Sequence, residues 1–338
     1  MNGNPKVEAI GRKLSGVRML HVVLFATLIG FWIAAVVTRA PTQVAIVNKQ
    51  GKQILTLNFD AASSFSEGLA AVRRGGRWGY VDKRGIVIIP PTFAEAGEFR
   101  DGIGRVVHHG KVGFIDHGGE FAITPRFERG SGFSEGLAAV STGGRFGYVD
   151  IDGQFSIAPQ FESADSFHEG LAAVKVAASA GLWGYIDKNG QFAIPPRFDS
   201  AGRFADGLAA VKVQGTDGVR WGFVNKKGVL TIAPQFEGSR DFCQGLAAVR
   251  SSGKWGYIDT AGKWAISPAF DEARDFCEGL AQVGTTNGAG TMARGYVDKT
   301  GRYVLPPRAG IVSASGFSDA LASLTVTRRW YERISPLN

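Results

Sequence analysis

The stretch that decides the fold runs from Phe65 to Phe99 and reads FSEGLAAVRRGGRWGYVDKRGIVIIPPTFAEAGEF. Almost everything that follows it is a copy, because the phenylalanine that links one copy to the next recurs in steps of 34, 34, 34, 37, 38, 34 and 41 residues. A fixed period in this range is the signature of a repeat architecture. The linking residues are Phe65, Phe99, Phe133, Phe167, Phe204, Phe242, Phe276 and Phe317.

Each copy contains three short segments that are typical of β-strands. The first follows an acidic residue and a glycine, as in Leu69–Val72, and consists of small side chains suited to close packing. The second contains Trp78–Val81. The third alternates large apolar residues with small or polar ones, as at Phe121 and Ile123, which is the pattern of a strand with one buried face. We therefore expect an all-β fold built of three-stranded units.

Turn chemistry separates these segments. Asp82-Lys83-Arg84-Gly85 and its copies place Asp or Asn first and glycine fourth, which is typical of a type I turn followed by a residue with positive φ. The third strand is expected to end at Pro91 and its equivalents, because proline has no N–H for the ladder. The segment from Phe93 through Ala96 to Phe99 has a spacing of three, which leaves both a helical turn and a packed loop open.

On these residues the chain resembles the WG-repeat family of bacterial proteins. The matching signature is Gly-Leu-Ala-x-Val, then Trp-Gly-Tyr-Ile/Val-Asp-x-x-Gly, then Pro-x-Phe, and it covers residues 44 to about 326. Two copies depart from it, with Val112 and Arg294 at the tryptophan position. The resemblance implies a β-rich binding or scaffold array with no established catalytic residue.

The two ends of the array are incomplete in complementary ways. Val44–Phe65 holds the second and third strands without the first, whereas Leu321–Val326 is a first strand without its partners. Seven full units and two halves make eight. A closed, propeller-like ring that pairs the two halves would hide both edges, and we favour it over an open β-solenoid with two incomplete caps.

An apolar segment precedes the repeats. Met19–Val37 contains 19 residues without a formal charge, long enough for a transmembrane signal-anchor helix of about 28 Å. More positive charge precedes it than follows it, so the expected arrangement is a single pass through the inner (cytoplasmic) membrane with the repeats in the periplasm. The resulting division is a cytoplasmic tail (1–18), the anchor (19–37), a linker (38–43), the repeat domain (44–326) and a C-terminal tail (327–338). A cleaved signal peptide, giving a secreted or periplasmic protein, is the alternative.

Charge argues against nucleic acid as a partner. The net charge is +8, and residues 1–40 supply +4 of it from five bases and one acid. The remaining +4 is small for a chain of this length, whereas a nucleic-acid-binding protein shows a concentrated basic footprint.

The connection between the first and second strands of each unit nevertheless collects basic residues. It is also the connection that lengthens in repeats four, five and seven, and insertions confined to one connection mark one face, often the binding face. The only acid in these loops is Asp217, so eleven bases and one acid give +10. We expect this basic edge to bind an anionic partner: a protein, an envelope polymer or a lipid. Its residues are Arg73, Arg74, Arg77, Lys111, Arg145, Lys175, Lys212, Arg220, Arg250, Lys254 and Arg294.

No catalytic residue, cofactor or metal ion is predicted. The recurring turn aspartates are explained by turn chemistry, and the Trp and Tyr columns by core packing. His108, His109 and His117 lie in one repeat but have no further ligand at metal-binding spacing beyond the turn residue Asp116. The expected function is a membrane-anchored, non-catalytic binding or scaffold module of the cell envelope. The alternative is an envelope hydrolase or enzyme accessory with a site in the irregular loops of repeats two and seven.

Two cysteines are too few for a disulfide scaffold. Cys243 and Cys277 each follow a linking phenylalanine and so occupy one position in neighbouring repeats. In a ring, equivalent positions are expected on separate sheets about 10 Å apart, which predicts two free, largely buried thiols.

Overall fold

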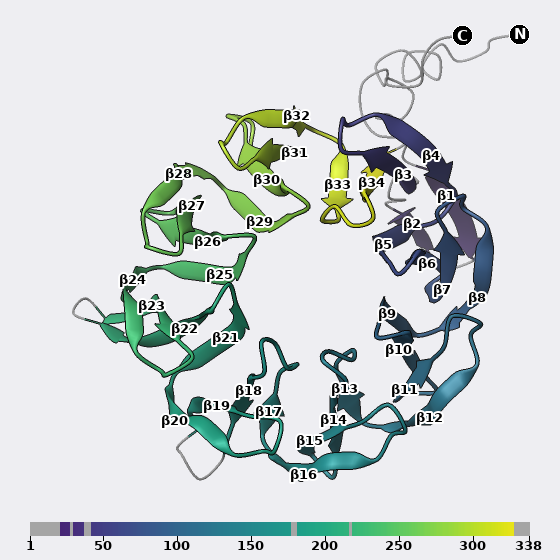
Figure 1. The fold of residues 1–338 in the computed structure, drawn as a ribbon. Helices are drawn as coiled ribbons and strands as arrows, with labels where there is room; N and C mark the ends of the chain where they lie inside the picture. Colours follow the sequence, from purple (N-terminus) through teal and green to yellow (C-terminus); the bar gives the residue numbers. More distant parts are fainter. Residues whose placement is uncertain (1–20, 28–29, 37–41, 177–180, 216–217, 328–338) are drawn as a thin grey trace, which may run out of the picture. The chain divides into compact units, whose positions relative to one another are not determined.

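The computed structural model describes residues 21–27, 30–36, 42–176, 181–215 and 218–327. Between residues 42 and 327, eight four-stranded antiparallel sheets follow one another round a closed ring, the arrangement of a β-propeller (Figure 1). We name the sheets blades I to VIII, beginning with the blade that joins the two ends of the chain, and letter their strands a to d from the inside of the ring outward.

Blades I to IV contain the following strands, in the order a to d: β33 (Ile311–Ala314), β34 (Leu321–Thr327), β3 (Thr42–Asn48) and β4 (Gln53–Leu57) in I; β5 (Ala61–Ser66), β6 (Leu69–Arg74), β7 (Arg77–Asp82) and β8 (Val87–Phe93) in II; β9 (Glu95–Arg100), β10 (Ile103–His108), β11 (Lys111–Ile115) and β12 (Phe121–Phe127) in III; β13 (Arg129–Gly130), β14 (Ala138–Thr142), β15 (Arg145–Val149) and β16 (Phe155–Phe161) in IV.

Blades V to VIII contain, in the same order: β17 (Ser163–Ala164), β18 (Ala172–Lys175), β19 (Trp183–Ile186) and β20 (Phe192–Phe198) in V; β21 (Ser200–Ala205), β22 (Leu208–Gly215), β23 (Gly218–Asn225) and β24 (Leu230–Phe236) in VI; β25 (Gly238–Cys243), β26 (Leu246–Ser251), β27 (Lys254–Asp259) and β28 (Trp264–Phe270) in VII; β29 (Glu272–Cys277), β30 (Leu280–Thr286), β31 (Met292–Asp298) and β32 (Tyr303–Arg308) in VIII.

Each blade therefore has four strands, and the prediction of three was wrong. The additional one is strand a, formed by the linking segment whose spacing of three suggested a helical turn or a loop. In blade II the register shifts between Ala62 and Phe65, so Ser63 and Ser64 of strand a oppose the single residue Ala71 of strand b. The hydroxyl oxygen of Ser63 accepts a hydrogen bond of 3.0 Å from the Ala71 N–H within this bulge. Because the bulge breaks the period of two, the sequence pattern conceals the strand.

Strand d does not end at its prolines, as the sequence had suggested. β8 continues through Pro90 and Pro91 to Phe93. Proline is tolerated here because β8 is the outer edge strand of the blade, where an N–H group can be absent without breaking the ladder. The prolines bulge over Gly79 of strand c, where an added Cβ would lie 2.6 Å from Pro91 N. The glycine of each Trp-Gly pair is thus required by a close backbone approach.

The hydrophobic core lies between the blades. Tyr80 in strand c of blade II is fully buried, packs edge-on against Phe99 of blade III, and donates a 2.7 Å hydrogen bond to the Gly97 carbonyl of that blade. Tyr148, Tyr185, Tyr257 and Tyr296 make the same bond to their next blade. The tyrosines are core residues, as expected, and each of these phenolic groups is satisfied as burial requires.

Blade I closes the ring with strands from both ends of the chain. β34 pairs with β3 from Leu321 opposite Asn48 to Thr327 opposite Thr42. The Ser323 hydroxyl of blade I also donates a 2.7 Å hydrogen bond to the Ser63 carbonyl of blade II. The closed ring of eight units is confirmed and the open solenoid is wrong. The repeat domain extends slightly beyond the predicted range 44–326, because β3 begins at Thr42 and β34 ends at Thr327.

The N-terminal segment differs from the prediction of a helix over Met19–Val37. β1 (His21–Thr27) and β2 (Gly30–Val36) form a two-stranded antiparallel sheet with Phe25 opposite Trp32. The segment is rich in β-branched and aromatic residues, which favour strands over helices. Among the residues that the structure describes, no helix is both long and apolar enough to span a membrane. The predicted cytoplasmic tail, 1–18, and residues 328–338 of the predicted C-terminal tail, 327–338, lie outside the described residues.

Candidate functional site

The hairpins between strands b and c open on one face of the ring, together with the connections from strand d to the next strand a. We call this the hairpin face, and the opposite side, with the a–b and c–d turns, the turn face. All eleven predicted basic residues flank b–c hairpins, so the structure places them on the hairpin face: Arg73, Arg74, Arg77, Lys111, Arg145, Lys175, Lys212, Arg220, Arg250, Lys254 and Arg294. Asp217, the one acid counted with them, lies outside the described residues.

Acidic residues from the d–a connections share this face, and they lower the charge that the loops alone suggested. Several of their carboxylates accept hydrogen bonds from backbone N–H groups of the neighbouring hairpins: Gly75 donates to Asp60 (3.0 Å), Gly144 to Glu128 (3.0 Å) and Gly253 to Glu237 (3.0 Å). The sequence count of +10 omitted them because they belong to a different connection of each unit. These residues are Asp60, Glu128, Glu162, Asp199, Glu237 and Asp271.

Three of the predicted cations are paired with these acids. Lys254 Nζ lies 2.5 Å from Asp271 Oδ1. This hydrogen bond is the largest contribution to the lowered pKa of Asp271. Lys175 lies 3.8 Å from Glu162, and Arg250 lies 3.8 Å from Glu237. Their charges are compensated locally, although both longer contacts are solvent-exposed and weak.

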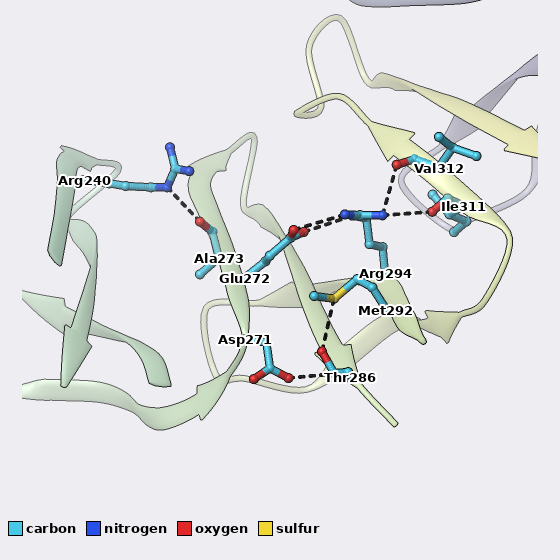
Figure 2. Close-up of polar contacts among 9 residues, drawn as sticks. All are labelled: Arg240, Asp271, Glu272, Ala273, Thr286, Met292, Arg294, Ile311 and Val312. Carbon is cyan, nitrogen blue, oxygen red and sulfur yellow. Dashed lines mark hydrogen bonds and ion pairs between the residues drawn. The ribbon is translucent and has the colours of Figure 1, made fainter. Parts of the chain in front are cut away.

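The Arg294 side chain forms hydrogen bonds within blade VIII and to blade I (Figure 2). Its Nε and Nη2 donate to the two carboxylate oxygens of Glu272, at 3.0 and 3.1 Å. Its Nη1 donates to the carbonyls of Ile311 and Val312, at 3.2 and 3.0 Å, in strand a of blade I. The guanidinium stands where four other units have tryptophan, and it joins blade VIII to the closing blade. It is therefore a structural residue of the hairpin face.

Five of the predicted cations are exposed and have no ion pair within the described part of the chain: Arg73, Arg74, Arg77, Lys111 and Arg145. The last three each occupy the first position of strand c, in the consecutive blades II, III and IV. We call these three the cationic arc. Arg73 and Arg74 lie on the same hairpin as Arg77, with their guanidinium groups over Trp78 (5.7 Å) and Phe59 (4.3 Å).

Of the remaining predicted cations, Lys212 is half-buried, and the Arg220 guanidinium donates a 3.4 Å hydrogen bond to the neighbouring Val219 carbonyl.

The three histidines of repeat two do not converge. His108 and His109 lie against each other on the hairpin face, with ring centroids 4.1 Å apart. His117 is on the turn face, where its ring stacks on Phe99 and Nε2 lies 3.2 Å from Glu67. Nowhere in the described ranges do three or more His, Cys, Asp or Glu residues gather in a way that would hold a metal ion. The irregular loops of repeats two and seven belong to blades III and VIII, which are separated by blades I and II.

The turn face carries a continuous ring of hydrogen bonds that the sequence reading missed. The residue before each a–b turn glycine has positive φ, and its side-chain oxygen accepts from the backbone N–H of the next blade's turn. The acidic–Gly pair that recurs in the sequence was the available clue. The donor and acceptor pairs are Gly68–Asp319, Gly102–Glu67, Gly136–Asp101, Gly170–Glu135, Gly207–Glu169, Gly245–Asp206, Gly279–Gln244 and Ala320–Glu278.

Strand a of blades VI to VIII carries charged residues and cysteines near one another. In blades VI to VIII, Arg203 Nε lies 3.2 Å from Asp241 and its Nη2 lies 3.7 Å from Asp275. Burial raises the pKa of Asp241 to about 6 and also raises that of Asp275. Cys243 and Cys277 belong to the same group and are half-buried rather than largely buried.

The predicted 10 Å separation of the two cysteines is wrong, because their side chains are close enough to interact. That distance applies between the faces of packed sheets, whereas the inner strands of a ring converge toward its axis.

A cavity of about 360 Å³ opens on the turn face beside the inner strands of blades II to IV. Its lining includes Glu67, Glu98, Arg100, Asp101 and Glu135. Glu67, Asp101 and Glu135 already accept the turn hydrogen bonds described above. These lining carboxylates therefore connect neighbouring blades.

Solved structures with a similar fold are only remotely related in sequence. A eukaryotic initiation factor is 8% identical, with a TM-score of 0.51 over 80% of this chain and 96% of the other. A quinonprotein alcohol dehydrogenase-like protein from Bacteroides thetaiotaomicron is 10% identical, with a TM-score of 0.44 over 92% and 94% of the two chains. The first of these supports the propeller fold alone. No curated protein matches the chain.

The family comparison matches most of the chain. The description "WG containing repeat" fits residues 46–78, 78–111, 113–145, 146–177, 183–216, 221–255 and 255–287. Most of these segments begin in strand c of one blade and extend to the next, so the sequence repeat straddles two blades. The chain therefore belongs to the WG-containing repeat family, with its repeats arranged as an eight-bladed propeller.

Proposed function

We propose that this protein is a non-catalytic binding module that docks on an anionic surface through its hairpin face. The observation that carries the proposal is the cationic arc. Arg77, Lys111 and Arg145 occupy one position in three consecutive blades and project exposed charge without an ion pair among the described residues. Several other predicted cations are paired with acids or with the ring. Regular spacing of like charges on a rigid frame suits a surface of repeated anionic groups, such as lipid headgroups or an acidic envelope polymer.

We propose further that the protein is held at the inner membrane with the propeller on the periplasmic side. This rests on sequence composition: Met19–Val37 is apolar and uncharged, and Lys6, Arg12, Lys13 and Arg18 precede it. We expect the protein to remain with the membrane fraction after a carbonate wash and to keep its N-terminus. A soluble form beginning near Pro41 would instead support secretion after cleavage.

The arc is tested by replacing its three cations together. The variant Arg77→Ser, Lys111→Ser, Arg145→Ser should bind vesicles of mixed anionic and neutral lipid about tenfold or more weakly than the parent at low salt, because each contact near an anionic surface contributes roughly 1 kcal/mol. Binding should also weaken as salt screens the charges. Cosedimentation of the propeller, residues 42–327, with vesicles measures both effects.

A matched control removes three cations from the turn face. Arg84, Lys227 and Arg302 are exposed residues of c–d turns, and changing all three to serine lowers the net charge equally. This control should bind like the parent. Equal loss in both variants would show that net charge alone matters, and equal binding to neutral and anionic vesicles would contradict the proposal. Retained binding to an acidic polysaccharide, with none to vesicles, would identify a polymer as the partner.

A further inference from the structure

We propose that Cys243 and Cys277 form a redox-sensitive pair that closes into a disulfide between blades VII and VIII. Nothing in the proposed anion binding requires this pair, and the two proposals are independent.

The geometry of the inner strands brings the two thiols together. Cys243 ends β25 opposite Leu246, and Cys277 ends β29 opposite Leu280, so both lie at the same register position of neighbouring strands. A side chain at this position reaches the next inner strand: the equivalent Ser66 and Ser134 hydroxyls each donate a 2.6 Å hydrogen bond to the carbonyl of the next blade's linking phenylalanine. The Cys243 and Cys277 side chains are accordingly close enough to interact. Cys277 also lies against Gly316 of blade I, where an added Cβ would be 3.1 Å from Sγ. The absence of a side chain at Gly316 leaves room for the Cys277 sulfur at this position.

The surroundings make one thiol the nucleophile. The interaction with Cys277 lowers the pKa of Cys243 to about 7, and Arg203 acts in the same direction, whereas burial, Asp275 and Asp206 oppose it. The pKa of Cys277 is raised, first by its interaction with Cys243 and then by burial. A thiol with a pKa near the ambient pH is the better attacking group in thiol–disulfide exchange. Cys243 should therefore react first and Cys277 second.

The reaction requires a small disulfide as the oxidant. The Cys243 thiolate attacks one sulfur of that disulfide, a mixed disulfide forms, and the first small thiolate leaves and takes up a proton. Cys277 then loses its proton and attacks the Cys243 sulfur, which expels the second small thiol. Two protein thiols are oxidised to one disulfide while the small disulfide is reduced to two thiols. The product joins strands a of blades VII and VIII beside the blade that closes the ring.

The experiment uses full-length reduced protein incubated across a series of ratios of reduced to oxidised glutathione, followed by alkylation and mass spectrometry. We expect the intact protein to lose two hydrogens and to yield a peptide cross-linked between Cys243 and Cys277. Two alkylated cysteines at every ratio, or a stable glutathione adduct on the parent protein, would overturn the proposal.

Two single variants test the order of attack. Cys277→Ser should stop at a glutathione adduct on Cys243, since the resolving thiol is missing. In the reduced parent at pH 7, iodoacetamide should alkylate Cys277 about tenfold more slowly than Cys243. Equal rates for the two cysteines would contradict the assigned order, and an adduct that fails to form on Cys277→Ser would contradict the role of Cys243 as the nucleophile.

Discussion

At the scale of single residues, Arg294 replaces the tryptophan of the repeat pattern and makes contacts that are specific to its blade. A tryptophan at this position packs as a half-buried core residue in other blades, as Trp78 does. Arg294 instead makes four charge-assisted hydrogen bonds, two to Glu272 and two to carbonyls of blade I. Bidentate arginine–carboxylate pairs are among the stronger polar contacts in proteins. The departure coincides with the junction where the last blade meets the closing blade.

We predict that Arg294→Met lowers the free energy of unfolding by about 1–3 kcal/mol, because Glu272 and two carbonyls lose their donor while the pair remains partly solvated. The matched control is Arg250→Met, whose contact with Glu237 is longer, at 3.8 Å, and more exposed, and whose cost should be below about 0.5 kcal/mol. Urea unfolding of both variants and of a double-mutant cycle with Glu272→Gln measures the coupling. Equal costs for the two arginine variants, or no coupling in the cycle, would refute the role of Arg294.

At the scale of the elements, two bulges define the blade. One lies in strand a and hides that strand from the period-two pattern; the other lies in strand d and carries the prolines over the glycine of strand c. At Gly79 the close approach is to backbone atoms of Pro90 and Pro91, which cannot move aside as a flexible side chain would. The glycine of the Trp-Gly pair is therefore explained by the packing of strand d on strand c and does not indicate a binding motif.

We predict that Gly79→Ala destabilises the propeller by about 3 kcal/mol or more, the upper part of the range for overpacking, since the added methyl group meets backbone. The control is Gly132→Ala in blade IV, where an added Cβ has no neighbour within 4 Å and should change stability by less than about 0.5 kcal/mol. Thermal unfolding followed by circular dichroism compares the two. A mild effect at Gly79 would show that the strand-d bulge relaxes easily.

At the scale of the whole propeller, stability depends on joining two incomplete ends. β3 and β4 from the beginning of the array share blade I with β33 and β34 from its end, and the ladder between β3 and β34 covers seven residue pairs. Without this ladder both strands would present unpaired edges, which promote aggregation. Closure also explains how the ring of turn hydrogen bonds continues without a break from Glu278 through Asp319 to Gly68.

We predict that residues 42–327 tolerate circular permutation. Thr42 and Thr327 are directly opposed in the ladder, so a linker of about five Gly and Ser residues can join them. New termini between Gly143 and Gly144, in an exposed hairpin, should preserve cooperative unfolding within about 2 kcal/mol of the unpermuted chain. A second permutant cut inside β14, between Ala139 and Val140, should fail to fold because the break interrupts a buried strand. The prediction is wrong if the hairpin permutant is the one that fails.

The sequence by itself determined the all-β class, the eight units and the pairing of the two ends, because these follow from a recurring pattern and from the way each half-unit lacks what the other supplies. Turn residues such as Asp82 and Gly85 were also readable, since their chemistry is local. Strand a was not readable: its hydrogen bonds go to a neighbouring strand through a bulge, which erases the period of two. The strands of the N-terminal segment, His21–Thr27 and Gly30–Val36, were not readable either, because length and apolarity alone do not choose between a helix and a pair of strands.

Only the tertiary structure decided which charges remain free and which side chains meet. Counting one connection gave a strongly basic edge, but Asp60, Glu128 and Asp271 come from a different connection and reach the same face when the chain folds. Likewise, Cys243 and Cys277 are 34 residues apart in the sequence, and their contact exists because inner strands converge on the axis of the ring. A repeat pattern specifies the strands of each blade. Contacts between equivalent residues of neighbouring blades depend on how far those residues lie from the axis of the ring, because neighbouring blades are closest at their inner strands.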